Sequence, residues 1–194
     1  MITYPREMTK RFFDIILSGF LLLLLSPVMI VVYIVVKVGS PGPAIYWSSR
    51  IGYKGVTFLM PKFRSMNIGT PAVATHLLSN PSNWLTPEGR LLRKLSLDEL
   101  PQLWSIFRGD MSFVGPRPAL FNQIDLIELR KQRGVDILIP GLTGLAQVSG
   151  RDELSIQMKV NLDVEYLNRR AFWFDIWIII KTILQVIQGR GVTH

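Results

Sequence analysis

Asp98 and Glu99 are adjacent acids in a stretch that is otherwise basic and apolar, Leu91 to Gln102. Ser96 lies three residues before Glu99, which is the spacing of a capping box and predicts a helix with both acids in its first turn. Pro101 leaves a second register open, in which it is the first helical residue and the acids lie in the preceding turn. The free N–H groups and the dipole of such a turn favour the ionised carboxylate. The pair could then bind a divalent cation, or Asp98 could attack an electrophilic phosphorus atom. A plain helix cap is the competing interpretation, and these residues alone do not exclude it.

Cations accompany the acidic pair along the sequence. Arg93 lies just upstream of it, where a cation suits a phosphorylated substrate. Arg117 stands between two prolines, which fix φ and present its guanidinium on a stiff backbone that could grip a phosphate with two N–H groups. Lys62 and Arg64 alternate around Phe63, where a solvent-exposed strand edge is the simpler explanation. Phosphate binding is therefore a hypothesis for each of these cations, beside a purely structural role.

Composition narrows the possible partners. The 194 residues include 22 Lys and Arg against 14 Asp and Glu, a formal net charge of +8, which predicts a nucleic acid, an acidic membrane surface or a phosphorylated substrate as partner. The sequence shows no recognisable nucleic-acid-binding motif, and its cations are spread along the chain, which argues against the first. The absence of Cys excludes disulfides and a Cys nucleophile. With His76 and His194 as the only histidines, a Ser-His-Asp triad or a His-rich metal site is not expected.

An uncharged apolar run extends from Ile15 to Val36, and as a helix of about 33 Å it could cross a bilayer. It is too long for a cleaved signal peptide, and no small-residue cleavage site follows it. In its middle, Pro27 predicts a sharp kink, and the Ser26 hydroxyl could bond a carbonyl that the proline leaves free. Lys and Arg flank both ends, whereas a spanning helix usually shows them on one side. The pattern leaves open a spanning helix and a helix that enters the membrane, breaks and returns to the same face.

The remaining sequence indicates a helix-rich α+β domain, residues 39–194, after a membrane-associated segment, residues 1–38. Two short strands around a Gly-containing turn are expected between Ala44 and Met60. Residues 67–88 are polar and rich in Pro, and they are long enough for a lid or substrate loop. Residues 140–151 are a Gly-rich loop and strand without the context of a dinucleotide or P-loop site. Helices are expected at residues 120–133, 153–170 and 172–181, the last with tryptophans that suit the headgroup level of a membrane.

Short blocks of sequence follow one another in a fixed order: Lys10-Arg11-Phe12-Phe13-Asp14, Ser26-Pro27, Gly42-Pro43, Lys62 to Met66, Leu92-Arg93-Lys94, Ser96 to Gln102, Gly109 to Pro118, and Pro140 to Arg151. In kind and order these blocks resemble the bacterial sugar transferase family, the monotopic phosphoglycosyl transferases of the PglC type. The resemblance extends from about Lys10 to Val192, nearly the whole chain.

The resemblance implies an enzyme that transfers a phosphosugar from a UDP-sugar to a polyprenyl phosphate such as undecaprenyl phosphate. UMP is released, and glycoconjugate assembly starts at the inner face of the bacterial cytoplasmic membrane, with the catalytic domain facing the cytoplasm. By the same resemblance, Asp98 is the covalent nucleophile and Glu99 is associated with a required Mg²⁺, so that both belong to the metal site. Arg93 and Arg117 are placed near the substrate phosphates.

Lys62 and Arg64 fall in a basic block of the family and are expected to bind substrate. The resemblance also implies that Ser26 and Pro27 form the break of a re-entrant helix-break-helix hairpin, with interfacial amphipathic helices elsewhere and anionic lipids as partners. Two other classes of protein remain hypotheses: a membrane-anchored scaffold without catalysis, and a membrane-tethered nucleic-acid binder.

Overall fold

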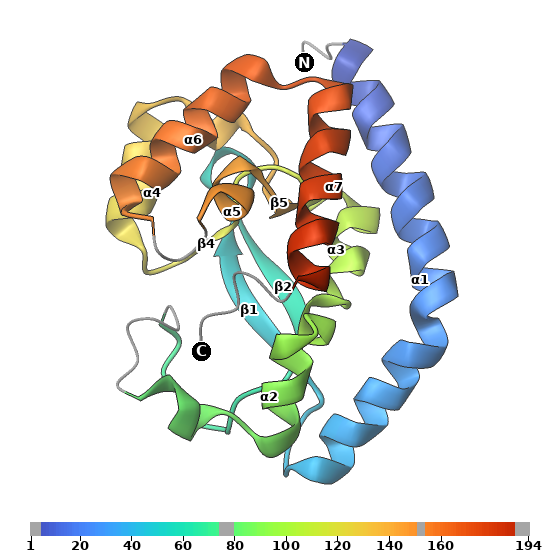
Figure 1. The fold of residues 1–194 in the computed structure, drawn as a ribbon. Helices are drawn as coiled ribbons and strands as arrows, with labels where there is room; N and C mark the ends of the chain where they lie inside the picture. Colours follow the sequence, from blue (N-terminus) through green and yellow to red (C-terminus); the bar gives the residue numbers. More distant parts are fainter. Residues whose placement is uncertain (1–4, 74–79, 151–153, 189–194) are drawn as a thin grey trace.

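The computed structural model describes residues 5–73, 80–150 and 154–188, the side chains of residues 5–7 and 81 excepted. It has the helix-rich α+β fold that the sequence predicts, with one long helix along the side of a body made by the other elements (Figure 1). The α-helices are α1 (Pro5–Gly39), α2 (Pro87–Lys94), α3 (Gln102–Arg108), α4 (Ile124–Gln132), α5 (Leu145–Ser149), α6 (Ile156–Arg169) and α7 (Phe172–Ile187). The strands are β1 (Ile45–Ile51), β2 (Thr57–Phe63), β3 (Ser112–Val114), β4 (Ala119–Leu120) and β5 (Gly141–Thr143). Short 3-10 helices are η1 (Tyr53–Gly55), η3 (Pro81–Trp84), η4 (Leu97–Glu99) and η5 (Val135–Ile137).

Helix α1 is continuous from Pro5 to Gly39, with Pro27 inside it, and it bends along its length (Figure 1). The resemblance implied a break at Ser26 and Pro27, and the helix does not show one. Pro27 has no N–H to donate to the carbonyl of Leu23, and the Ser26 hydroxyl donates to that same carbonyl at 2.8 Å. The predicted compensation by the serine is therefore confirmed. Both ends of α1 lie against the body (Figure 1), and Leu21, Leu22 and Leu25 in its middle pack against the main core cluster with one side of the helix.

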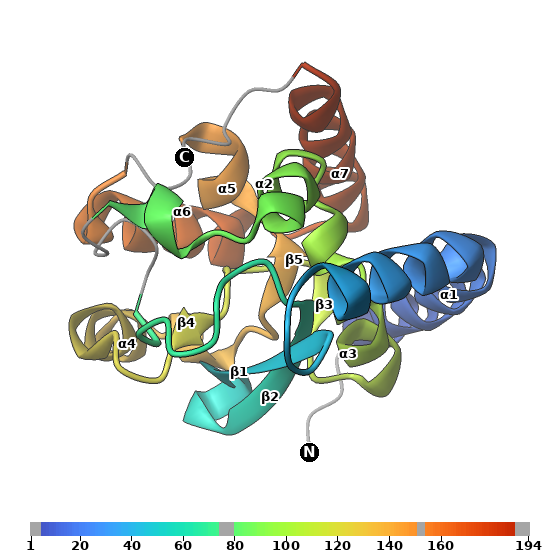
Figure 2. The same ribbon diagram turned by 90° about the horizontal axis from the view of Figure 1, so that it is seen from below.

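Residues 8–39 of α1 are long and apolar enough to cross a membrane. Only 11% of the most apolar 18-residue window is buried in the protein, so most of this surface needs another apolar environment. Seen from below, α1 projects from one side of the body, and its two halves overlap in the view (Figure 2). The helix therefore presents its apolar surface on one side of the molecule.

Two hydrophobic clusters hold α1 on the body. The larger one packs the amino-terminal half of α1 against α3 and α7. The smaller one joins Val32 and Val36 of α1 to Leu92 of α2, with Leu97 and Leu100 packed at its edge. Because Leu97 and Leu100 flank the two acids in sequence, the segment that carries the acids is docked on the carboxy-terminal half of α1.

Two cations near the start of α1 add polar attachments. Lys10 Nζ donates to Asp175 Oδ2 of α7 at 2.5 Å. Arg11 donates to the carbonyl oxygens of Ile106 and Phe107 at 2.6 and 2.7 Å, at the end of α3. A cation at this position bonds carbonyl oxygens of the last turn of α3 and opposes the negative end of the helix dipole. These contacts fix where α1 begins relative to α3 and α7.

The β1–β2 hairpin supplies one wall of the site. Tyr46 of β1 lies opposite Lys62 of β2, and β4 pairs with the other edge of β1 opposite Arg50. Because successive side chains alternate between the two faces of a strand, Tyr46, Ser48, Arg50 and Lys62 share one face. The strands predicted between Ala44 and Met60 are thus confirmed. Strands β3 and β5 form a separate, parallel pair.

The other helices occur near their predicted positions. Residues 120–133 contain α4 and residues 153–170 contain α6, whereas α7 continues beyond the predicted segment to Ile187. The Gly-rich segment 140–151 contains the expected strand, β5, but also a short helix, α5, that the sequence did not predict.

Candidate active site

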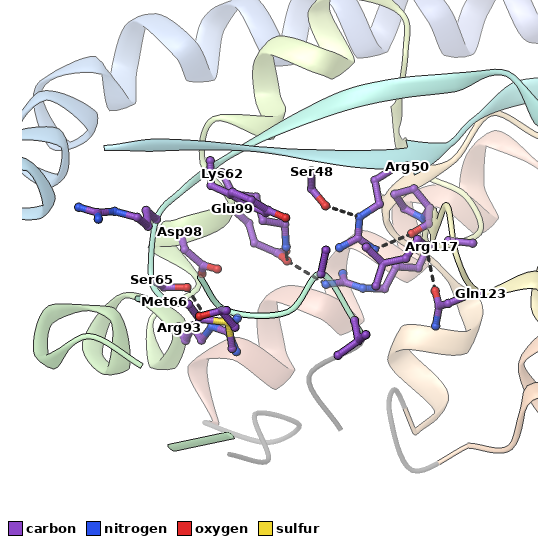
Figure 3. Close-up of a pocket in the computed structure, with 18 of the residues that line it drawn as sticks. Ser48, Arg50, Lys62, Ser65, Met66, Arg93, Asp98, Glu99, Arg117 and Gln123 are labelled. Atoms are coloured by element: carbon purple, nitrogen blue, oxygen red, sulfur yellow. Dashed lines mark hydrogen bonds and ion pairs between the residues drawn. The ribbon is translucent and has the colours of Figure 1, made fainter. Parts of the chain in front are cut away.

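The acidic pair lies in a cavity of about 540 Å³ in the body of the molecule (Figure 3). The β1–β2 hairpin, η4, the residues before β4 and helix α5 contribute to its walls. Among the described residues, two acids and seven cations line it: Asp98, Glu99, Arg50, Lys62, Arg64, Arg93, Arg117, Arg130 and Lys159. All six of the charged residues predicted from the sequence are in this set. The excess of positive charge fits an anionic ligand.

The capping box predicted at Ser96 is wrong. Ser96 has a left-handed φ of 54°, its side chain makes no cap hydrogen bond, and its N–H donates to the carbonyl of Arg93 at 3.0 Å. Ser96 therefore lies in the turn after α2, which ends at Lys94, and does not begin a longer helix. The two acids lie in η4 (Leu97–Glu99), a single 3-10 turn, and α3 starts only after Pro101. The left-handed turn and the apolar residues on either side of the acids direct this segment into the cavity.

Glu99 holds two cations with one carboxylate oxygen. Its Oε1 lies 2.8 Å from Lys62 Nζ and 2.9 Å from Arg117 Nη2 (Figure 3). Burial alone would raise the pKa of Glu99, but Lys62 and Arg117 hold it well below its usual value of 4.5. Burial lowers the pKa of Lys62, and the charge of Glu99 opposes that effect. Glu99 is therefore an ionised carboxylate that fixes two cations in the cavity wall.

Asp98 is 6% exposed and lines the same cavity. Burial raises its pKa above the usual 3.8, Lys62 is the largest opposing influence, and the adjacent Glu99 adds to the rise. The sequence predicted the opposite direction from a helix dipole, which the single turn of η4 does not supply. Arg93 also acts to lower the pKa of Asp98, and its Nε donates to Ser65 Oγ at 3.0 Å.

Two arginines that the sequence analysis did not single out complete the wall. Arg50 Nη1 donates to the carbonyl of Pro118 at 3.1 Å, and burial together with the nearby Arg117 lowers the pKa of Arg50 to about 10. Arg130 donates to the carbonyl of Arg117 at 2.8 Å and pairs with the buried Asp163 at 2.8 Å. Strand alternation places Arg50 on the same face of the hairpin as Lys62 and could have identified it once the hairpin register was known. No local pattern marks Arg130, because its partners are distant in sequence.

Arg64 lines the cavity, but its guanidinium is hydrogen-bonded to the turn that follows α1. Its guanidinium donates to the carbonyl of Pro41 and, at 2.8 and 3.0 Å, to the carbonyl and hydroxyl oxygens of Ser40. Arg64 thereby joins the end of β2 to the turn that follows α1. Its contact with substrate stays a prediction. Ser26 and Pro27 are not among the lining residues and lie within α1.

The predicted lid borders the cavity in part. Residues 67–73 line it, and residues 74–79 lie outside the described part of the chain. Asn122 Nδ2 donates to the carbonyl of Ala72 at 2.9 Å, which attaches this segment to the loop before α4. The position of residues 67–73 is consistent with a loop that contacts substrate.

Asp98 and Glu99 supply the hard carboxylate oxygens that Mg²⁺ prefers. No group of three or more His, Cys, Asp or Glu lies together within the residues that the structure describes. Mg²⁺ commonly takes only one or two protein carboxylates and completes its octahedron with water and substrate phosphates. The residues present therefore fit Mg²⁺ bound together with a phosphorylated substrate, and they do not fit a closed structural zinc site.

Comparison with known proteins places this site in a family. A family model described as bacterial sugar transferase matches residues 5–189. The undecaprenyl-phosphate galactose phosphotransferase of Salmonella typhimurium is 39% identical over 94% of this chain and 41% of its own length. The exopolysaccharide production protein ExoY of Rhizobium meliloti is 37% identical over 95% of this chain and 88% of its own length. The uncharacterized sugar transferase EpsL of Bacillus subtilis is 37% identical over 94% of this chain and 89% of its own length.

The chain therefore spans less than half of the Salmonella relative and most of the other two. The family match covers all of the described residues, including α1 and every charged residue of the cavity. The chain belongs to the bacterial sugar transferase family.

Proposed function

We propose that this protein transfers a sugar phosphate from a UDP-sugar to a polyprenyl phosphate such as undecaprenyl phosphate, releases UMP and so initiates polysaccharide assembly. The observation that carries the proposal is a buried acidic pair in a cation-lined cavity, docked through Leu97 and Leu100 on a long apolar helix. Names of relatives support the substrates. The Salmonella relative is named for undecaprenyl phosphate and galactose, and one from Erwinia amylovora is named a UDP-galactose-lipid carrier transferase.

In the first step, a carboxylate oxygen of Asp98 attacks the phosphorus that bears the sugar. A bond forms between that oxygen and the phosphorus, the bond to the bridging oxygen breaks, and UMP leaves with the electron pair. In the second step, a phosphate oxygen of the polyprenyl phosphate attacks the same phosphorus and releases Asp98. A covalent intermediate lets a water-soluble donor and a lipid acceptor use one site in turn.

The cations around Asp98 address the main obstacle, which is the repulsion between a carboxylate and a diphosphate. Arg93, Arg117 and Lys62 lie within electrostatic reach of Asp98 and can spread the charge of the transition state. Mg²⁺, held by Asp98 and Glu99, would supply further positive charge at the diphosphate. Glu99 also keeps Lys62 and Arg117 in place when no substrate is bound.

The bend of α1 supports a re-entrant membrane anchor. Both ends of the helix lie on the same body, and exposed apolar side chains lie on either side of Pro27, including Phe20, Leu23 and Val31. On α7, exposed Trp173 and Trp177 suit the headgroup level of a membrane. In this arrangement the body faces the cytoplasm, its net positive charge favours anionic lipids, and the cavity lies near the interface where the acceptor phosphate must be.

The test uses the purified full chain in nanodiscs with undecaprenyl phosphate, Mg²⁺ and a panel of UDP-sugars. The wild type is expected to release UMP from at least one sugar nucleotide and to gain the mass of a phosphosugar when the acceptor is omitted. Asp98→Asn is expected to lose both signals, and Asp125→Asn on the exposed surface of α4 serves as the control. Normal turnover by Asp98→Asn would exclude Asp98 as the nucleophile.

A further inference from the structure

Gln147 is a buried side chain that the proposed chemistry does not use. It lies on α5, is 6% exposed and lines the cavity. Its side-chain oxygen and nitrogen are both buried, and neither has a hydrogen-bond partner among the described residues. Buried polar groups of native proteins are nearly always paired, so an unpaired one requires an explanation. Because the carboxamide borders the cavity, a ligand in the cavity would supply its missing partners.

Gln147 differs from the other buried groups that lack a partner. Within the described chain, Arg64 and Gln102 each have one such atom. The remaining guanidinium nitrogens of Arg64 are hydrogen-bonded, and Gln102 does not line the cavity. Gln147 alone of these three combines an unpaired donor, an unpaired acceptor and a place in the cavity wall.

The backbone around Gln147 is held in a fixed position. A Cβ atom on Gly144, which precedes α5, would lie 2.1 Å from the carbonyl oxygen of Gly115, so only glycine allows this close approach. Gly115 N–H in turn donates to the carbonyl of Thr143 at 2.9 Å. This pairing attaches the start of α5 to the residues just before Arg117. Gln147 and the proposed phosphate-binding Arg117 are therefore positioned at one cavity by the same backbone contacts.

We propose that Gln147 is a specificity-determining residue whose carboxamide pairs with a neighbouring donor and acceptor on the nucleotide-sugar. This inference rests on the proposed function. A carboxamide presents an N–H donor and a C=O acceptor side by side. The N3–H and O4 of uracil offer the complementary pair, and so do adjacent hydroxyl groups of the sugar. A site built to hydrogen-bond such groups strongly rejects ligands that lack them, because its own polar atoms are then left unpaired.

The unpaired amide has a consequence that can be measured without any ligand. A buried polar group without a partner destabilises the protein, and an apolar group of the same shape removes that cost. Gln147→Met has nearly the same volume and no hydrogen-bonding group. We expect its melting temperature in nanodiscs to equal or exceed that of the wild type, while its affinity for the donor falls. A clearly lower melting temperature would contradict the assignment of an unpaired amide.

The binding experiment measures Kd for UMP and for UDP-galactose, UDP-glucose and UDP-N-acetylgalactosamine by isothermal titration. Gln147→Met is expected to raise the Kd of the best-bound UDP-sugar at least tenfold. Gln147→Glu, which loses the N–H donor, should also raise this Kd. If the affinity for UMP falls by the same factor, the groups that pair with Gln147 are on the uridine. If the affinity for UMP does not change, they are on the sugar. Unchanged affinities in both variants would overturn the inference.

Gln185 provides the matched control. Its Nε2 donates to the carbonyl of Val148 at 3.0 Å, so it contacts α5 from the side of α7, and it does not line the cavity. Gln185→Met is expected to affect stability without a change in either affinity. Binding of no tested nucleotide by the wild type would refute the proposed function and the inference with it, whereas equal binding by wild type and Gln147→Met would refute only the inference.

Discussion

Glu99 shows how one side chain can organise the charges of the cavity. It joins Lys62 from β2 to Arg117 from the residues before β4, with both contacts on Oε1. Each of the three charges would be costly to bury alone, and the shared contact offsets part of that cost. Removing one member leaves the others without compensation, so the geometry of the site depends on all three.

Lys62→Met tests this dependence. The substitution keeps the length of the side chain and removes the cation that lies 2.8 Å from Glu99. We expect kcat/KM for UMP release to fall by about 10 to 100-fold, because Glu99 and Arg117 are no longer held in place. Lys54→Met, in the turn of the same hairpin and exposed to solvent, is the control and should retain activity. Full activity of Lys62→Met would show that the ion pair is dispensable.

Arg130 holds the backbone of Arg117 in position. It donates to the backbone carbonyl of Arg117 and pairs with Asp163, which is 2% exposed. Arg130→Met leaves a buried carboxylate unpaired, and we expect the free energy of unfolding to fall by about 3–5 kcal/mol. Chemical unfolding in detergent measures this loss. The double variant Arg130→Met/Asp163→Leu is expected to recover most of the stability, and no recovery would mean that the pair is not the cause.

The loss in Arg130→Met should depend on pH. Burial raises the pKa of Asp163 above its usual 3.8, and Arg130 opposes the rise, so the variant has a still higher pKa. Between that pKa and 3.8 the folded variant binds a proton that the unfolded chain does not, so its stability falls as pH rises through this window. The deficit relative to the wild type is therefore largest at neutral pH and shrinks towards pH 3.8. A deficit that does not change with pH would contradict this assignment.

At the scale of elements, α1 contains a proline, and a neighbouring serine replaces the hydrogen bond that the proline cannot make. The sequence predicted the kink and the serine contact, and the structure confirms that Ser26 bonds the carbonyl freed by Pro27. That local repair is also why the helix bends instead of breaking. The remaining elements were predictable where a periodic pattern sets them, as for the hairpin and for α4, α6 and α7. Helix α5 was not, because its short turn depends on the contact of Gly144 with Gly115.

Leu23→Lys tests whether the bend of α1 is inserted in the membrane. Leu23 precedes Pro27 by about one helical turn and is 79% exposed, so a lysine there does not disturb the packing of the body. A lysine at the centre of a membrane-inserted helix costs about 2.5–3.5 kcal/mol. We therefore expect a smaller share of the protein to remain in membranes after alkaline carbonate extraction.

Ile137→Lys is the control for this experiment. Ile137 is 45% exposed on η5, within the body, and the same change of charge there should leave the membrane-bound share as in the wild type. If Leu23→Lys and Ile137→Lys behave alike, the bend is not inserted.

For the molecule as a whole, sequence motifs identified the acids and cations that meet in the cavity, but not how they are held. The acids were expected in a helical turn with a lowered pKa, and the structure places them in a 3-10 turn where burial raises the pKa of Asp98. Arg50, Arg130 and Gln147 were missed. Their roles arise from contacts between β1 and β4, between α4 and α6, and between β3 and β5, which no local pattern reveals.

The arrangement of α1 and the body leads to a prediction about topology. The start of α1 and the catalytic body contact each other directly, through Lys10 and Arg11, and the carboxy-terminal half of α1 docks beside the acids. A re-entrant helix keeps all of these groups on one side of the membrane. The chain has no Cys, so a single introduced cysteine can be labelled without background.

Two variants test this topology: Met8→Cys, near the start of α1, and Asp125→Cys, on α4. We expect both cysteines to react with a membrane-impermeant maleimide in inside-out vesicles, which expose the cytoplasmic face. Neither should react in intact cells whose outer envelope has been made permeable to the reagent. Both positions are exposed in the protein, so protection from the reagent reports on the membrane. A helix that spans the bilayer would place the two cysteines on opposite faces, and only one of them would then react in each preparation. That pattern would refute the re-entrant anchor while leaving the chemistry of the cavity intact, because the contacts of Lys62, Glu99 and Arg117 do not involve α1.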